Sequence, residues 1–267
     1  MKKTKIALDY HSFPPEIASF LTKADIYDSS CSKLAKVYYI DKNQGCFLKI
    51  ATAGALKTEH LMHVYFHRLG FTTAVLFYQT IGDNDYLITE KVLGEDCTHY
   101  FNDPERLCDT IAANLRKLHE QPIADCPIQD RITGYVSAVH NGHARGKYEH
   151  DLFKGLWEFS SVQDAWDAAK EGIQSLERNT LIHGDYCLPN IILNKWKLSG
   201  FIDLGRGGVA DRHIDILWGI WTLKYNLGTA RYTDRFIDIY GRDFVNKDKL
   251  RWIAAMEMFG ESNKKKI

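Results

Sequence analysis

Short runs of alternating apolar and polar positions dominate the first third of the chain. The run Val37-Tyr38-Tyr39-Ile40 is rich in strand-forming residues, the polar stretch "DKNQG" follows, and "CFLKI" returns in the same pattern. This order predicts a hairpin, because turn residues separate two β-favouring segments. The stretch "TAVLFYQTIGDNDYLITEKV" repeats the pattern around Gly82-Asp83-Asn84-Asp85, so a second hairpin is expected there.

Helical spacing of apolar residues marks the remaining elements. The segment from Leu56 to Leu69 places its apolar side chains near one helical face. Asp103-Pro104 is a helix start, with Asp as cap and Pro in the first turn, and Ser161-x-x-Asp164 predicts a capping box. Further helices are expected through "IDILWGIWTL", "YTDRFIDIY" and "KLRWIAAMEMF". The pattern therefore predicts an α+β, bilobal protein. Its smaller N-terminal lobe, residues 1–92, holds an antiparallel sheet with one main helix. Its larger lobe, residues 93–267, is mainly helical.

Composition and charge exclude several classes of function. Lys+Arg and Asp+Glu both total 34, so the formal net charge is zero and the basic excess of a nucleic-acid binder is missing. No apolar run has the length of a signal peptide or a bilayer span, so we expect a cytoplasmic protein without membrane contact. The scattered cysteines are expected to be reduced thiols, and we expect a monomer or a weak homodimer. These cysteines are Cys31, Cys46, Cys97, Cys108, Cys126 and Cys187.

Polar residues in two predicted lobes together suggest phosphoryl transfer. Asp185 and Asn190 share the loop in "LIHGDYCLPNIIL", and Asp203 ends the apolar strand in "LSGFIDLG". Lys49 lies on a predicted strand of the other lobe, ahead of Glu59 on a predicted helix. Transfer from ATP needs a lysine held by a carboxylate, oxygen ligands for Mg²⁺ and a loop carboxylate that receives the acceptor's proton. Each residue alone is commonly a turn, cap or surface group, but their joint order matches H-x-D-x₄-N followed by D-x-G.

The blocks "HGDYCLPNIIL" and "SGFIDLGRGGVAD" resemble the aminoglycoside phosphotransferase family, whose fold is similar to that of protein kinases. "AKVYYI", "FLKI", "LRKLHEQPIADCP" and "MEMF" resemble the 3′-phosphotransferase branch, and the resemblance runs from about Ser30 to Phe259. It implies an enzyme that transfers phosphate from ATP or GTP, with Mg²⁺, to a hydroxyl of an aminoglycoside and so confers antibiotic resistance.

For the nucleotide and the metal, the resemblance assigns the following roles. Asp185 is the catalytic carboxylate, and Asn190 and Asp203 bind Mg²⁺. Lys49 contacts the ATP phosphates and pairs with Glu59. Two further residues or segments are expected to contact adenine. Phe47 lies against the adenine ring, and the hinge Thr89–Lys91, with Glu90 at its centre, contacts the edge of adenine through backbone groups.

For the acceptor, the resemblance places Arg206 on the active-site wall and Glu257 and Phe259 at the drug pocket. Glu149, Asp151 and Glu158 are further candidate acids, because an acceptor with several ammonium groups needs several carboxylates.

The chain departs from the family pattern at several points, including Met256 where an acid is expected before Glu257 and the segment "GESNKKKI" after Phe259. The nucleotide loop "DSSCSKLAKVY" contains no glycine, so Ser30 or Ser32 is expected to offer hydroxyl and backbone donors, and which one faces phosphate stays open. Leu188-Pro189 stands where the branch tends to carry another acid. The substrate range is therefore expected to be narrower than that of the 3′-phosphotransferase branch.

Other interpretations stay open beside this one. The acceptor could be another antibiotic or a metabolite alcohol such as choline or homoserine, or the chain could bind nucleotide without catalysis. A protein kinase is disfavoured, because the short segment between Asp203 and Asp215 leaves no long activation segment.

His63 and His67 have zinc-ligand spacing but lack a third ligand, so a partly exposed helix face is expected. Cys187 is expected to be an apolar filler rather than a nucleophile.

Overall fold

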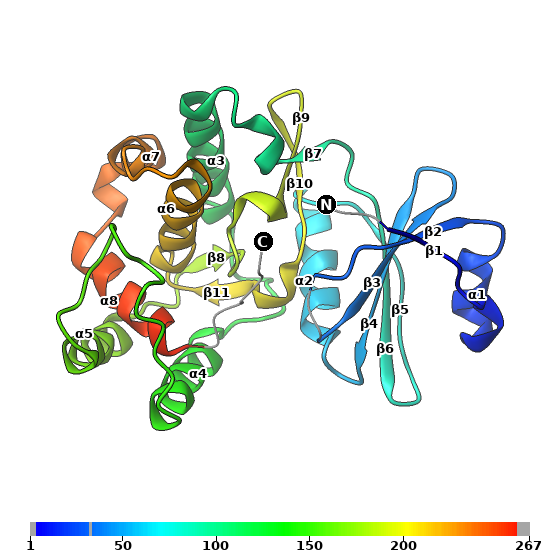
Figure 1. Ribbon diagram of the computed structural model, residues 1–267, viewed down its shortest axis with the longest axis horizontal. Helices are drawn as coiled ribbons and strands as arrows, with labels where there is room; N and C mark the ends of the chain where they lie inside the picture. The colour runs from blue at the N-terminus through cyan, green and yellow to red at the C-terminus, as the bar shows by residue number, and fades with distance from the viewer. Residues whose placement is uncertain (1–3, 32–33, 261–267) are drawn as a thin grey trace.

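The structure is a computed structural model, in which residues 4–31 and 34–260 are described. Figure 1 shows two lobes, with the sheet-rich N-terminal lobe on the right and the helical C-terminal lobe on the left. Within the described ranges the large sheet has six strands, in the order β1-β2-β3-β4-β6-β5, and all their pairings are antiparallel. The strands are β1 (Thr4–Ile6), β2 (Asp25–Asp28), β3 (Lys36–Asp41), β4 (Cys46–Thr52), β5 (Val75–Ile81) and β6 (Asn84–Glu90).

The two faces of this sheet carry different helices (Figure 1). Helix α1 (Pro15–Leu21) buries Ile17 and Leu21 against Ile40 and Leu48, which belong to one face. Because side chains alternate along a strand, Lys49 on β4 points to the opposite face. Helix α2 (Lys57–Arg68) lies on that side, toward the C-terminal lobe.

The C-terminal lobe combines long helices with two small antiparallel sheets. The helices are α3 (Pro104–His119), α4 (Ile132–Ala144), α5 (Val162–Ser175), α6 (His213–Leu227), α7 (Thr233–Tyr240) and α8 (Lys247–Phe259). One sheet has the order β10-β9-β7 and the other pairs β11 with β8. Their strands are β7 (Glu95–Asp96), β8 (Thr180–Ile182), β9 (Ile191–Asn194), β10 (Lys197–Phe201) and β11 (Gly208–Ala210).

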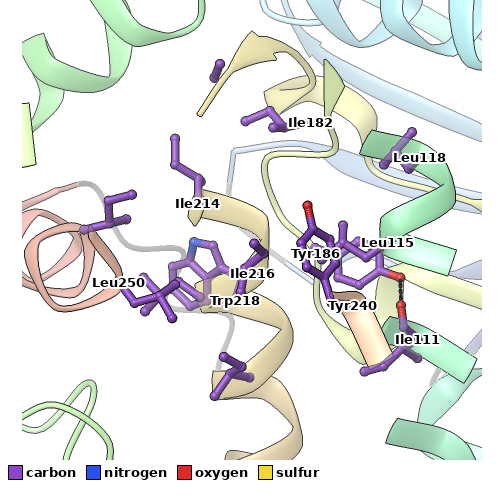
Figure 2. Close-up of a cluster of buried hydrophobic side chains, with 14 of the residues drawn as sticks. Ile111, Leu115, Leu118, Ile182, Tyr186, Ile214, Ile216, Trp218, Tyr240 and Leu250 are labelled. Carbon is purple, nitrogen blue, oxygen red and sulfur yellow. Dashed lines mark hydrogen bonds between the residues drawn. The ribbon is translucent and has the colours of Figure 1, made fainter. Parts of the chain in front are cut away.

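The core of this lobe supports the loop between β8 and β9. Figure 2 shows Tyr186, from that loop, among apolar side chains of α3, α6 and α7. The Tyr186 ring is fully buried, and its hydroxyl donates a hydrogen bond to the Ile111 carbonyl oxygen at 2.7 Å. A buried hydroxyl that finds a partner anchors the loop as well as filling space.

The described residues confirm the predicted α+β, bilobal architecture. The expected hairpins are β3–β4 and β5–β6, and the expected helix at Leu56–Leu69 is α2. The side chains of Asp103 and Ser161 accept hydrogen bonds from backbone N–H groups at the starts of α3 and α5, as the capping patterns predict. Helix α1 and strands β1 and β2 were not predicted. The boundary after residue 92 stays a prediction.

Two further expectations concern thiols and membranes. All six cysteines are free thiols, as expected. None of the described helices combines the length and the apolar character needed to cross a bilayer.

Candidate active site

The loop of residues 183–190 joins β8 to β9, and its last three residues form the short helix η3 (Leu188–Asn190). Gly184 in this loop has a φ of +81°, in the left-handed region that favours glycine. A Cβ at this position would lie 2.1 Å from the Arg206 carbonyl oxygen. Both the backbone conformation and the close approach therefore require glycine beside Asp185.

A buried carboxylate behind the loop fixes its backbone. Asp215 on α6 accepts hydrogen bonds from the N–H of His183 at 2.6 Å and the N–H of Gly184 at 2.8 Å. The His119 ring lies between Asp215 and Tyr240: Nε2 is 3.3 Å from Asp215 Oδ2, and Nδ1 is 2.8 Å from the Tyr240 hydroxyl. Burial lowers the pKa of His119, so a neutral ring that donates from Nε2 and accepts at Nδ1 satisfies both contacts. Helices α3, α6 and α7 thus hold the start of the loop.

Hydrogen bonds join the two functional side chains of the loop. Asn190 Nδ2 donates to the Asp185 backbone oxygen at 2.9 Å and to its carboxylate Oδ2 at 3.0 Å. The Asp185 N–H donates to His183 Nδ1 at 3.2 Å, and His183 Nε2 contacts the Ile202 carbonyl oxygen at 3.0 Å. Because both hydrogen bonds from Asn190 Nδ2 go to Asp185, Asn190 Oδ1 is the amide atom that can bind a cation.

Lys49 connects the two lobes. Its Nζ lies 2.6 Å from Glu59 Oε2 on α2 and 3.1 Å from Asp203 Oδ1, after β10. Burial alone would lower the pKa of Lys49, but the attraction of Asp203 and Glu59 outweighs burial and raises that pKa above its usual value. The predicted pairing of Lys49 with Glu59 is therefore present, and Lys49 stays charged.

Asp203 has an unusual backbone. Its φ of 62° and ψ of 53° lie in the left-handed region, which few residues other than glycine adopt. Such conformations cost about 1–3 kcal/mol and persist where the surroundings impose them, commonly at functional sites. Here the conformation directs the carboxylate toward Lys49, across the boundary between the lobes.

A cleft of about 350 Å³ lies at this boundary. Lys49, Glu59, Asn190 and Asp203 all line it, and Phe47 contributes apolar surface. The structure therefore brings together five residues that the sequence predicted for the nucleotide and the metal. Glu90, also predicted, lines the cleft as well, and Ser32 lies outside the described residues.

The expected hinge Thr89–Lys91 also lines the cleft. The N–H of Glu90 donates to the Ala74 carbonyl oxygen at 3.0 Å, and the N–H of Lys91 donates to the Gly45 carbonyl oxygen at 3.1 Å. These two donors serve the sheet itself, so the segment is held in a fixed position. The contact of Glu90 with adenine stays a prediction.

A second cavity, of about 190 Å³, borders the other part of the 183–190 loop, because Gly184 lines it. Arg206 and Glu257, both predicted to contact the acceptor, line this cavity together with Arg131 and Tyr135. Glu257 is 3% exposed, and its carboxylate accepts a hydrogen bond from Trp218 Nε1 at 3.3 Å. Burial raises its pKa, although the Arg206 charge opposes this.

The other acceptor candidates are not among the described residues that line this cavity. Phe259 is buried, packs beside Trp166 and His143, and is not among the described residues that line the cavity. The Glu149 backbone N–H donates to the Met258 carbonyl oxygen at 2.9 Å, which ties its segment to α8. The exposed Asp151 carboxylate lies 3.8 Å from Lys154 Nζ, and the exposed Glu158 accepts from the Gly155 N–H at 3.4 Å. The substrate roles of all these candidates stay predictions, those of Arg206 and Glu257 included.

No role was predicted for His119 or Asp215, although they lie in the segments "LRKLHEQPIADCP" and "IDILWGIWTL". Their role depends on contacts between separate helices, which spacing along the chain cannot reveal. The expectation of a partly exposed helix face was wrong for His63, which is 5% exposed and bonds the Thr73 carbonyl oxygen at 3.1 Å. No group of three or more metal-binding side chains of His, Cys, Asp or Glu occurs in the described part of the chain.

The donor set at the cleft nevertheless suits Mg²⁺. This cation is usually bound by one or two carboxylates together with substrate phosphates and waters, so a large protein cage is not required. Asp203 offers a carboxylate, and Asn190 offers an amide oxygen whose orientation its bonds to Asp185 fix. Both line the same cleft as Lys49, where a triphosphate would bring further oxygens.

Comparisons with known proteins agree with this geometry. Residues 34–253 match the model of the phosphotransferase enzyme family. A probable aminoglycoside 3′-phosphotransferase of Lactococcus lactis subsp. lactis (strain IL1403) is 42% identical over 96% of this chain and 98% of the relative. An aminoglycoside 3′-phosphotransferase of Niallia circulans is 30% identical over 84% of this chain and 87% of the relative.

Solved structures show the same fold. An aminoglycoside phosphotransferase from Streptomyces rimosus, in complex with ADP and streptomycin, superimposes with a TM-score of 0.70 at 22% identity, covering 84% of this chain and 90% of that chain. A type VIII aminoglycoside-3′-phosphotransferase gives a TM-score of 0.68 at 23% identity, covering 85% of this chain and 90% of that chain. The chain is a phosphotransferase enzyme and belongs to the aminoglycoside phosphotransferase family, with the kinase-like fold of that family.

Proposed function

We propose that this enzyme transfers the γ-phosphoryl group of ATP or GTP to a hydroxyl of an aminoglycoside and so confers resistance to the antibiotic. The observation that carries this proposal is the bonded pair Asp185–Asn190, placed between the cleft that Asn190 lines and the cavity that Gly184 lines. A donor nucleotide in the cleft and an acceptor in the cavity would meet at Asp185. The names of the relatives at 42% and 30% identity support the same substrate class.

The chemistry follows from the positions of the side chains. The Asp185 carboxylate accepts a hydrogen bond from the acceptor hydroxyl and orients its oxygen toward the γ-phosphorus. As the new oxygen–phosphorus bond forms, the bond from the γ-phosphorus to the β–γ bridging oxygen breaks, and the hydroxyl proton passes to Asp185. ADP or GDP leaves with the electron pair of the broken bond. Positioning and charge stabilisation, rather than covalent chemistry by the protein, provide the rate enhancement.

Charged residues at the cleft hold the triphosphate. Lys49 contacts phosphate oxygens, and Glu59 keeps its ammonium group in place through the 2.6 Å ion pair. Asn190 Oδ1 and the Asp203 carboxylate would hold Mg²⁺, which neutralises charge on the phosphates. Because Asp203 also pairs with Lys49, the metal-binding group and the phosphate-binding group are fixed relative to each other.

Acceptor recognition uses the second cavity. An aminoglycoside carries several ammonium groups, and Glu257 offers a carboxylate in the cavity wall. An ammonium close to Glu257 would oppose the burial that raises the pKa of its carboxyl, and would favour the ionised form. Glu149 and Asp151 are proposed to add carboxylates from the segment that leads from α4 to α5. We expect the enzyme to act in the cytoplasm as a monomer or a weak homodimer.

The test is an ADP-release assay with Mg²⁺ and either ATP or GTP, across 4,5- and 4,6-disubstituted aminoglycosides. Product release that depends on the drug, with the phosphate located by ³¹P NMR, is the expected result. Failure on every drug of both groups would remove this substrate class while leaving the kinase chemistry open. Nucleotide binding without turnover of any acceptor alcohol would favour a non-catalytic module instead.

A further inference from the structure

The nucleotide loop, which runs from β2 to β3, contains serines in place of glycines. Ser30 uses its polar groups inside the loop: its N–H donates to Asp28 Oδ1 at 2.8 Å, and its Oγ accepts from the Val37 N–H at 3.0 Å. The hydroxyl of Ser30 therefore closes the base of the loop. Ser32 lies outside the described residues.

Ser29 occupies a different position. Its N–H donates to the Val37 carbonyl oxygen at 2.8 Å, which extends the pairing of β2 with β3 by one residue. Val37 in turn lies opposite Lys49 on β4. Directly opposed residues in antiparallel strands point to the same face, so Ser29, Val37 and Lys49 form one row on the cleft face. All three line the cleft, and two strand spacings place Ser29 about 10 Å from Lys49.

The Ser29 hydroxyl is buried without a partner. The residue is 4% exposed, and its Oγ has no hydrogen-bond partner among residues 4–31 and 34–260. Buried hydroxyls in folded proteins are nearly always bonded, so an exception in a ligand cleft requires an explanation. A ligand oxygen that enters the cleft would satisfy this donor.

We infer that the Ser29 hydroxyl donates a hydrogen bond to an oxygen of the ribose–triphosphate part of the nucleotide. This inference rests on the proposed function. Ser29 lies in the same row as Lys49, the residue expected to contact phosphate. This position favours a contact with the ribose–triphosphate part over a contact with the base. The contact would replace, with a side-chain hydroxyl, a donor that glycine-rich loops supply from their backbone. Because ATP and GTP share the ribose and the phosphates, Ser29 contributes equally to the binding of both.

The experiment compares Ser29→Ala with the wild type by calorimetric titration of ATP, ADP and adenosine, each with Mg²⁺. We expect the Kd for ADP and ATP to rise at least about fivefold, as the loss of a bond to a phosphate or ribose oxygen implies. A phosphate contact leaves adenosine binding unchanged, whereas a ribose contact weakens adenosine binding as well. Ser19→Ala is the matched control, because its exposed hydroxyl bonds the Glu16 carbonyl oxygen on α1, on the other face of the sheet.

Thermal unfolding separates binding from a structural role. The nucleotide-free Ser29→Ala protein should have a Tm at least as high as the wild type, since the change removes a buried hydroxyl without a partner. Wild-type Kd values for all three ligands in the variant, or a lower Tm of the nucleotide-free variant, would overturn the inference. If the wild type itself binds no nucleotide, the proposed function fails first, and the titration of the wild type shows this directly.

Discussion

Replacement of Asp185 by alanine separates the chemical step from nucleotide binding. The change removes the carboxylate proposed to orient the acceptor hydroxyl, and general-base catalysis of this kind contributes about 10²- to 10⁴-fold to the rate. Asn190 loses its 3.0 Å bond to Asp185 Oδ2 but keeps the 2.9 Å bond to the Asp185 backbone oxygen. The amide of Asn190 therefore stays oriented toward the cleft, and Lys49 keeps both of its carboxylate partners.

The expected result is a fall in kcat of about 10²- to 10⁴-fold with a Kd for Mg-ATP within about threefold of the wild type. Steady-state ADP release gives kcat, and calorimetric titration of the free enzyme gives the Kd. Asp185→Asn should lose as much turnover as Asp185→Ala, since it keeps the shape and an acceptor for Asn190 but cannot take the proton. Asp167→Ala, at an exposed acid on α5 that pairs with Lys170, is the control for loss of one negative charge.

Two outcomes would refute this reasoning. Near-wild-type turnover of Asp185→Ala would show that another group, or water, receives the proton. A loss of nucleotide affinity as large as the loss of kcat would show that Asp185 acts mainly in holding the donor substrate rather than the acceptor.

Two further predictions concern stability. Gly184→Ala should lose at least about 2 kcal/mol more unfolding free energy than Gly146→Ala and should have little activity. Both positions have positive φ, but an added Cβ meets the Arg206 carbonyl oxygen at 2.1 Å in the first and nothing within 4 Å in the second. Urea unfolding measures the difference, and equal losses would contradict the close approach. Asp211 is the second site: burial would raise its pKa, but its bonds to His213 and the charge of Lys249 lower it to about 2. The pKa of Asp211 is lower in the folded protein than the unfolded value of 3.8, so the ionised carboxylate stabilises the fold at pH values above 3.8. This stabilisation is lost as the pH falls through about 2. Asp211→Asn should therefore be less stable than wild type by about 2 kcal/mol at neutral pH, and the gap should close between about pH 4 and pH 2. A gap that stays constant over this range would refute the assignment.

The elements of the fold that follow from local sequence were predictable. Hairpins β3–β4 and β5–β6 and the starts of α3 and α5 depend on turn residues, alternation and caps that lie within a few positions of one another. Helix α1 was missed because it is short, and it is held mainly by packing of Ile17 and Leu21 against the sheet. Such packing has no signature within the helix itself.

The candidate site divides in the same way. Asp185 and Asn190 share one loop, so motif spacing was enough to group them. The pairing of Lys49 with Glu59 was inferred from a family resemblance and is present at 2.6 Å. Lys49 also pairs with Asp203, and these two residues lie far apart in sequence. This pairing also depends on the left-handed backbone of Asp203, which the sequence does not indicate.

The residues of this chain define the type of reaction better than they define the acceptor. The groups proposed to act on phosphate lie on short segments whose internal bonds fix them: the 183–190 loop, β4 and the turn after β10. The cavity proposed for the acceptor is instead assembled from α4, β8, the start of the 183–190 loop, the segment after Asp203, α6 and the end of α8. Its guanidinium groups, Arg131 and Arg206, are close enough that Arg206 adds to burial in lowering the pKa of Arg131. The proposed polycationic acceptor would therefore direct its ammonium groups toward Glu257, and toward Glu149 if that residue also contributes as proposed, with a hydroxyl-bearing edge toward the arginines.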